Sequence, residues 1–155
     1  MTRFATVLVA TDGTNDSDGA VDAALDLAHD TGARLLVLTV VPEGSAEESD
    51  EGDEGPSRES SSRDEDDEVT QASDRTNGVV DHAIEWGLEA QPLIWEGEPG
   101  EAIVAAASSE GADVIVIGTS SRSGVGRILL GSVTDHVVQH SSVPVMVVRT
   151  ERDRE

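Results

Sequence analysis

The chain contains no cysteine and no lysine, and only three of its 155 residues are aromatic. The absence of cysteine excludes disulfide bonds and thiolate chemistry, and it removes the most common ligands of structural zinc. All ten basic residues are arginines. Because a Walker-type phosphate loop needs a lysine, the sequence also excludes nucleotide hydrolysis by that route.

Long hydrophobic runs are also missing. No apolar run reaches the length of a membrane-spanning helix, and the N-terminus leads directly into a strand-like segment without the pattern of a cleaved signal peptide. We therefore expect a cytoplasmic protein that makes no contact with membranes. The length of the chain, residues 1–155, fits a single domain with one hydrophobic core.

Acidic residues outnumber basic residues by 32 to 10, which gives a formal net charge of −22. Half of this charge lies in residues 43–68, which contain 13 acids, two arginines and a single apolar residue, Ala46. We expect a disordered acidic insertion there, because the segment has too little apolar surface to offset the entropy of ordering. A lysine-free domain that is acidic throughout is typical of adaptation to high salt, as in a halophile. Such a surface disfavours nucleic acid and anionic membranes as partners.

The remaining chain alternates between short β-branched runs, which predict strands, and segments with apolar residues three and four apart, which predict helices. In the second helix we expect Ile84 and Trp86 on or near the apolar face. The alternation predicts a doubly wound α/β/α sandwich around a parallel sheet. The expected strands are 4–11, 34–41, 91–95, 114–117 and 143–149. The first expected helix begins at one of the residues 15–17 and ends at Gly32. The other expected helices are 69–86, 101–109 and one that begins at Gly131-Ser132.

The strongest functional signal follows the fourth strand. Gly118 closes that strand, and residues 119–130 form a loop rich in glycine and serine. We expect Ser132 to cap the next helix, so that the first backbone N–H groups of this helix point toward the strand end and form an anion site. Residues 114–134 include Arg122 and Arg127 but no acid, so a phosphate group is repelled least in this segment.

This segment, together with the following VTDHVV and PVMVVR, resembles the C-terminal signature of the UspA-type universal stress proteins, whose nucleotide-binding members carry G-x2-G-x9-G-[ST]. Gly118 matches the first glycine and Gly131-Ser132 match the last pair, whereas Ser121 replaces the second glycine. This replacement puts a side chain where the backbone approaches a phosphate. The resemblance covers nearly the whole chain apart from residues 43–68.

The resemblance implies a Rossmann-like sheet of five strands in the order 3-2-1-4-5, with ATP bound where the order reverses, between the first and fourth strands, and with Mg²⁺ carried by the nucleotide. It implies that Asp12 contacts the ribose and Val40 the adenine. By the same matching, the phosphates contact Gly118, Ser120, Ser121, Gly131, Ser132, Val133 and Thr134. The predicted site is completed by Ala10 and Thr11 at the end of the first strand, by Ile117 in the fourth strand, and by Arg122 and Arg127 in the loop that follows it.

Two functions remain open from the sequence. The first is a homodimeric adenine-nucleotide-binding module in a stress response, in which two copies pair through the apolar strand at 143–149. The second is a ligand-free stress or chaperone-like interaction protein that has lost ATP binding, for which Ser120 and Ser121 are the motivation.

We identify no general base, lysine clamp or metal site, so we expect no fast catalysis, although slow ATP hydrolysis stays open. His136 and His140 share a helix face, and we expect them at the surface or at a dimer edge.

Overall fold

The computed structural model describes residues 4–11, 15–42, 61–119 and 131–149. In this part of the chain five strands form one sheet in the order β3-β2-β1-β4-β5, and every neighbouring pair is parallel. The doubly wound fold and the strand order expected from the sequence are thereby confirmed. The strands are β1 (Thr6–Ala10), β2 (Arg34–Val41), β3 (Ala90–Glu96), β4 (Val114–Thr119) and β5 (Val145–Arg149).

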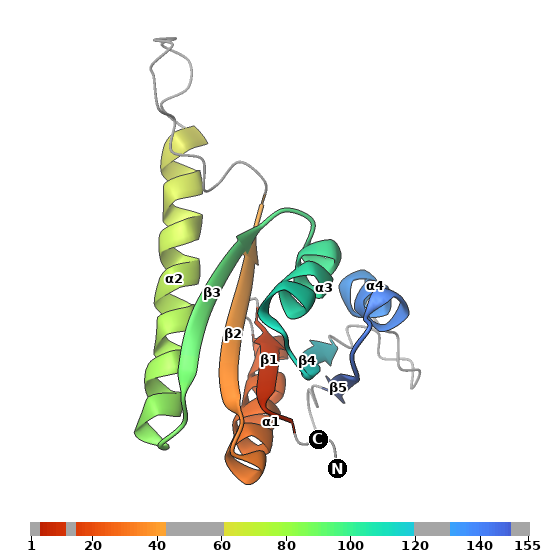
Figure 1. Ribbon diagram of the computed structural model, residues 1–155. Coiled ribbons are helices and arrows are strands. Elements are labelled where there is room, and N and C mark those ends of the chain that lie inside the picture. The colour runs from red at the N-terminus through yellow and green to blue at the C-terminus, as the bar shows by residue number, and fades with distance from the viewer. Residues whose placement is uncertain (1–3, 12–14, 43–60, 120–130, 150–155) are drawn as a thin grey trace, which may run out of the picture.

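Helices connect the strands and cover both faces of the sheet (Figure 1). They are α1 (Asn15–Thr31), α2 (Ser61–Glu85), α3 (Pro99–Glu110) and α4 (Ser132–His140). Helices α1 and α2 pack on one face, and α3 and α4 pack on the other. Right-handed crossovers between parallel strands produce this arrangement when the strand order reverses. None of the helices in the described ranges is long and apolar enough to cross a membrane.

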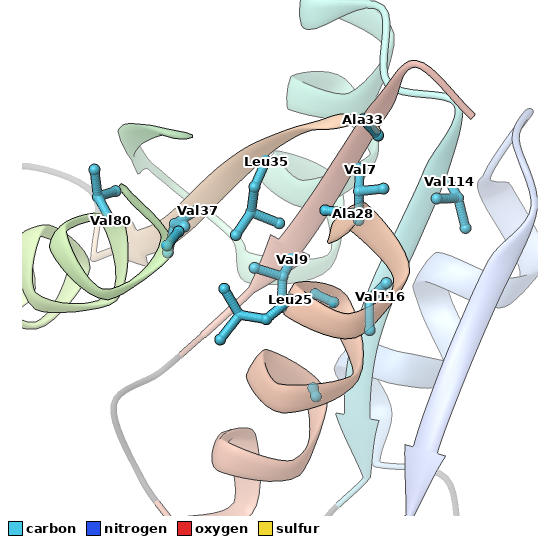
Figure 2. Packing of buried hydrophobic residues seen from close by; sticks show 13 residues of the cluster. Val7, Val9, Leu25, Ala28, Ala33, Leu35, Val37, Val80, Val114 and Val116 are labelled. Atoms are coloured by element: carbon cyan, nitrogen blue, oxygen red, sulfur yellow. The ribbon is translucent and has the colours of Figure 1, made fainter. Parts of the chain in front are cut away.

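Side chains alternate between the two apolar layers along each central strand. Val7 and Val9 of β1 face α1, with Leu25 of α1 packed against them (Figure 2). Leu8, which lies between them in sequence, packs instead in the layer under α3 with Leu36 of β2. Because both faces are covered, the central strands are almost continuously apolar, as the sequence indicated.

Helix α2 begins earlier than the sequence predicted. It starts at Ser61, whereas we expected residue 69, so residues 61–68 are helical although we assigned them to a disordered segment. The sequence places five consecutive acids at 64–68, in the first two turns of the helix. The rest of the predicted insertion, 43–60, lies outside the described residues.

The boundaries of β1, β3, β4 and β5 also differ from the prediction, by one or two residues at an end. β4 continues through Gly118 and Thr119, because these residues pair with Val148 and Arg149 of β5. β5 begins at Val145, two residues later than expected. Immediately before it, the Ser141 hydroxyl donates to the Val143 carbonyl at 2.8 Å and accepts from the Val143 N–H at 3.1 Å. This local turn uses the polar groups that a longer strand would have placed in the ladder.

The C-terminal end of α2 is more exposed than its apolar residues predicted. Val80 and Ala83 are buried against the sheet, but Ile84 is 55% exposed and Trp86 is 46% exposed. Ile84 flanks the buried stripe of the helix, and Trp86 follows the last helical residue, Glu85. Helical spacing in the sequence therefore identified the stripe but overestimated its width.

Candidate functional site

The carboxyl ends of β1 and β4 lie side by side at the point where the strand order reverses. β1 ends at Ala10 and β4 at Thr119. The next residue after β1, Thr11, is buried, and its N–H donates to the Leu38 carbonyl at 2.9 Å. In open parallel sheets this edge is where ligands bind, so it is the candidate site.

Helix α4 begins at this edge with a glycine cap. Gly131 has an extended backbone (φ −61°, ψ 162°), and its carbonyl accepts the Asp135 N–H at 2.9 Å. Gly131 is therefore the N-cap and Ser132 is the first helical residue, so the prediction that Ser132 caps the helix is wrong. Because glycine has no side chain, the cap supplies no hydrogen bond to the first N–H groups of α4, which suit an anion.

A side-chain bond ties the first turn of α4 to the end of β4. The Thr134 hydroxyl donates to the Gly118 carbonyl at 3.2 Å, and Thr134 is buried. This contact joins two residues that lie 16 positions apart in the sequence and that both belong to the predicted site. It fixes the position of the helix N-terminus relative to the strand end.

Four other predicted site residues share one apolar layer. They are Ala10, Val40, Ile117 and Val133, all packed in the cluster under α3 and α4. Gly131 and Ser132, by contrast, are exposed. The structure thus brings the predicted apolar contacts together from three strands and a helix, next to the exposed cap of α4.

Five predicted residues cannot be placed relative to this edge. Asp12, Ser120, Ser121, Arg122 and Arg127 lie outside the described residues. The ribose contact assigned to Asp12 and the phosphate contacts of the loop remain predictions.

A groove that the sequence did not indicate reaches Thr11 on the face of the sheet that α1 and α2 cover. It has a volume of about 430 Å³ and runs between α1 and α2. Asp18 and Asp22 line it from α1, and Arg75 and His82 line it from α2. These residues are separated by more than 50 positions in the sequence, and no local pattern relates them. The groove has an acidic wall and a basic wall, with Val21, Leu25 and Val79 among its apolar lining.

The two histidines of α4 stack on each other. The ring centroids of His136 and His140 are 4.1 Å apart with an interplanar angle of 19°, and Nδ1 of His140 lies 2.9 Å from the His136 carbonyl. His140 is exposed, whereas His136 is half-buried against Gly100 of α3. Within the described ranges no three His, Cys, Asp or Glu side chains are arranged to hold a metal ion.

These features define a class of protein: a doubly wound α/β domain with a glycine-capped helix N-terminus at the switch point of its sheet. The sequence profile of the universal stress protein family matches residues 3–149. The chain therefore belongs to the universal stress protein family.

Individual relatives agree with this assignment. Universal stress protein YxiE of Bacillus subtilis is 33% identical over 147 residues, which cover 94% of this chain and 99% of that protein. Two universal stress proteins of Methanocaldococcus jannaschii are 43% and 34% identical over 67 and 79 residues, or 43% and 51% of this chain. Those matches span 39% and 49% of the two relatives, less than half of their lengths.

Solved structures share the fold. The universal stress protein UspA of Lactobacillus plantarum superposes with a TM-score of 0.77 at 24% identity, over 96% of this chain and 100% of that one. A universal stress protein in complex with cAMP gives a TM-score of 0.68 at 25% identity, over 97% and 100%. A universal stress protein of Archaeoglobus fulgidus in complex with dAMP gives 0.69 at 21% identity, over 95% and 99%.

Proposed function

We propose that this chain is an adenine-nucleotide-binding module of a stress response, and that its ligand is ATP with Mg²⁺ carried by the nucleotide. The observation that carries the proposal is the cap of α4. Gly131 exposes the helix N-terminus at the switch point, and the bond from Thr134 to Gly118 holds it there. Helix N-termini bind phosphate through backbone N–H groups and the positive end of the helix dipole.

The electrostatics of the chain support the same position for phosphate. With a net charge of −22, most of the surface repels an anion, whereas residues 114–134 contain no acid. Two proteins with the same fold have been solved with cAMP and with dAMP, and both ligands combine adenine with phosphate. An apolar layer that includes Val40 and Ala10 beside the phosphate site provides a surface for a base.

The experiment is calorimetric titration of the protein with ATP and Mg²⁺ in molar KCl. We compare Gly131→Glu with Gly131→Gln, a pair that differs in charge but hardly in size. A Cβ at Gly131 meets no other atom of the described residues within 4 Å, and its φ of −61° suits any residue, so both variants should fold. The dissociation constant for ATP should be about tenfold or more higher for Gly131→Glu than for Gly131→Gln, because only the glutamate variant places a carboxylate near the phosphates.

The alternative is a stress or chaperone-like interaction protein without a nucleotide. Ser121 motivates it, because this residue stands where nucleotide-binding relatives of the matched pattern carry glycine. Folded protein that gives no heat with ATP at several temperatures would favour this alternative. Binding that appears in Ser121→Gly would then identify Ser121 as the cause.

We further propose that two copies pair through the outer edge of β5. Along a parallel strand, alternate residues direct their N–H and C=O groups to opposite sides. The Pro144 carbonyl accepts from Ile115 of β4, so Val145 and Val147 direct theirs outward, on the side where no described strand pairs with β5. Met146 of β5 is 38% exposed and adds apolar surface to this strand.

The other edge of the sheet is less suited to pairing. Glu89 and Gly97 bond to β2 through their backbone groups, so the same alternation places Pro92 of β3 with its missing N–H on the outer edge. Proline at an edge position blocks the addition of another strand. This asymmetry favours β5 as the edge that pairs.

We propose binding without fast turnover as the activity, because the described site offers a helix N-terminus and an apolar surface but assigns no residue to proton transfer. Slow ATP hydrolysis stays open, and its measurement belongs with the titration. The cytoplasmic location expected from the sequence stays a prediction.

A further inference from the structure

The groove between α1 and α2 lies on the face of the sheet opposite the apolar layer of the candidate nucleotide site. Leu25 in its lining belongs to the core under α1 and α2, and Val21 and Val79 pack against that core. Val40 and Ala10 of the candidate site pack against the other core. The groove volume of about 430 Å³ falls within the range of small-molecule pockets, about 300–1,000 Å³.

The two walls of the groove carry groups of opposite charge. α1 contributes Asp18 and Asp22, which lie about one turn apart, and α2 contributes Arg75 and His82, which lie about two turns apart. Acidic side chains are expected anywhere on a chain of net charge −22, so the basic wall is the unusual one. The structure describes the side chains of only three arginines, and one of them lines this groove.

Arg75 is the stronger anion partner of the basic wall. Its Nε donates to the Gln71 carbonyl at 3.2 Å, which uses one of the five donor hydrogens of a guanidinium. His82, by contrast, has the Glu85 carboxylate 4.0 Å from its Nδ1. Because guanidinium groups bind carboxylates through charge-assisted hydrogen bonds, this wall suits a carboxylate at Arg75.

A glycine in the middle of α2 leaves room in the groove. Gly78 lines it and is exposed, and a Cβ at this position would meet no described atom within 4 Å. Glycine inside a helix is less favourable than alanine, because it loses more backbone entropy on folding. The packing of the described residues gives no reason for glycine here. A ligand in the groove does, since it could then approach the helix backbone closely.

We propose that the groove between α1 and α2 binds a small aliphatic zwitterion, with an ammonium group and a carboxylate at the two ends of a short hydrocarbon chain. The ammonium group lies at Asp18 and Asp22, the carboxylate lies at Arg75, and the hydrocarbon chain crosses the apolar lining beside Gly78. A plain carboxylic acid is repelled by the α1 wall, and a plain amine gains nothing from the α2 wall. Thr11 is the one described residue that this site shares with the predicted nucleotide site.

The test is NMR titration of the full chain, with isotope-labelled valine methyl groups, against ω-amino acids of four, six and eight carbons. The methyl signals of Val21 and Val79 report the groove. The matched ligands are the carboxylic acid and the amine of the same chain length, each of which lacks one charged group. The titrations contain no nucleotide, so their result does not depend on ATP binding. They use the lowest KCl concentration at which the chain is folded, because salt screens the charges.

We expect saturable shifts of the Val21 and Val79 signals with at least one ω-amino acid. Its dissociation constant should be about three- to fivefold lower than those of the matched acid and amine, which is the strength of exposed ion pairs. Asp22→Asn should reduce the preference over the acid, and Arg75→Gln should reduce the preference over the amine. Gly78→Ala should weaken binding of the ω-amino acid, because the added methyl group stands in the groove.

Asp26→Asn is the matched control for Asp22→Asn, because Asp26 is exposed one turn further along α1 and does not line the groove. Asp22→Asn removes repulsion between like charges on α1, and Gly78→Ala improves helix propensity, so both variants should fold, as circular dichroism checks. The proposal is overturned if no ω-amino acid gives saturable shifts at the two valines, if the matched acid or amine binds as tightly, or if Asp26→Asn has the same effect as Asp22→Asn.

Discussion

At the scale of single residues, the contact of Gly100 in α3 with His136 in α4 depends on a missing Cβ. Gly100 lies in the first turn of α3, and a Cβ there would stand 2.9 Å from ring atoms of His136 and 3.0 Å from the His136 Cβ. Real Cβ atoms do not approach so closely, so the larger residue would push α4 away. Because α4 carries the candidate anion site at its N-terminus, this contact also positions the site.

We predict that Gly100→Ala lowers the free energy of unfolding by about 1–3 kcal/mol through overpacking, as measured by urea denaturation. The matched control is Gly78→Ala in α2, where a Cβ meets no described atom within 4 Å; it should raise stability by about 0.5–1 kcal/mol. His136→Ala should relieve part of the cost in the double variant, because it removes the ring atoms but keeps the Cβ at 3.0 Å. If Gly100→Ala behaves like the control, the two helices are not in the contact described.

A pair of buried hydroxyls joins α2 to the sheet. The Thr76 hydroxyl donates to the Ala72 carbonyl at 2.6 Å, so it accepts from Thr39 of β2, whose oxygen is also 2.6 Å away. Both side chains are buried. The Thr39 hydroxyl has its acceptor in Thr76, whereas the Thr76 hydroxyl has its acceptor in the Ala72 carbonyl. Loss of one hydroxyl should therefore destabilise the fold to a different extent at the two positions.

We predict that Thr76→Val lowers the free energy of unfolding by about 1–3 kcal/mol, because the Thr39 hydroxyl is then buried without an acceptor. Thr39→Val should cost less, because Thr76 keeps its bond to the Ala72 carbonyl. The double variant should be nearer to the original stability than Thr76→Val. Urea denaturation of the three variants provides the measurement, and strictly additive effects would contradict the hydrogen-bond assignment.

At the scale of elements, the two edge strands test the proposed dimer. Val147→Pro removes an outward N–H from β5 while leaving its ladder to β4, so we predict a folded monomer. Ile94→Pro makes the same change on the outer edge of β3 and should leave the dimer intact. Sedimentation equilibrium distinguishes monomers from dimers in the two variants. Met146→Lys is a second variant that should disrupt the dimer, and it leaves the backbone hydrogen-bonding groups unchanged. Dimers in both β5 variants would exclude pairing through this edge.

At the scale of the whole molecule, charge determines the conditions under which the fold is stable. The chain carries 32 acids against 10 arginines, and acids are exposed along α1, as at Asp18, Asp22, Asp26 and Asp30. Self-repulsion of this kind is relieved by counterions and acts against the compact state at low ionic strength.

We therefore predict that the free energy of unfolding rises between about 0.1 M and about 1 M KCl, where the Debye length falls from about 10 Å to about 3 Å, and then levels off. Urea denaturation at a series of KCl concentrations measures this dependence. A stability that does not change with salt would contradict the interpretation of the acidic composition as an adaptation to high salt.

Much of the fold could be predicted from local patterns. Mostly apolar runs such as residues 34–41 predicted the buried strands, and Gly32 correctly marked a helix end because it adopts a positive φ that other residues rarely take. The errors lie at boundaries, where weak terms decide. Helix α2 extends to Ser61, and the helix cap is Gly131 although Ser132 has the stronger intrinsic preference.

For the site, the sequence alone determined which segment is free of acids and which glycines match a nucleotide-binding pattern, since both are properties of composition and spacing. Only the tertiary structure decided which of these residues meet. It placed Thr134 on the Gly118 carbonyl, and it left Trp86 and Ile84 open at the other end of the sheet. The physical reason is that contacts between distant segments depend on how helices pack on the sheet, and one-dimensional periodicity records which face of a helix is apolar but not how much of it a neighbour covers.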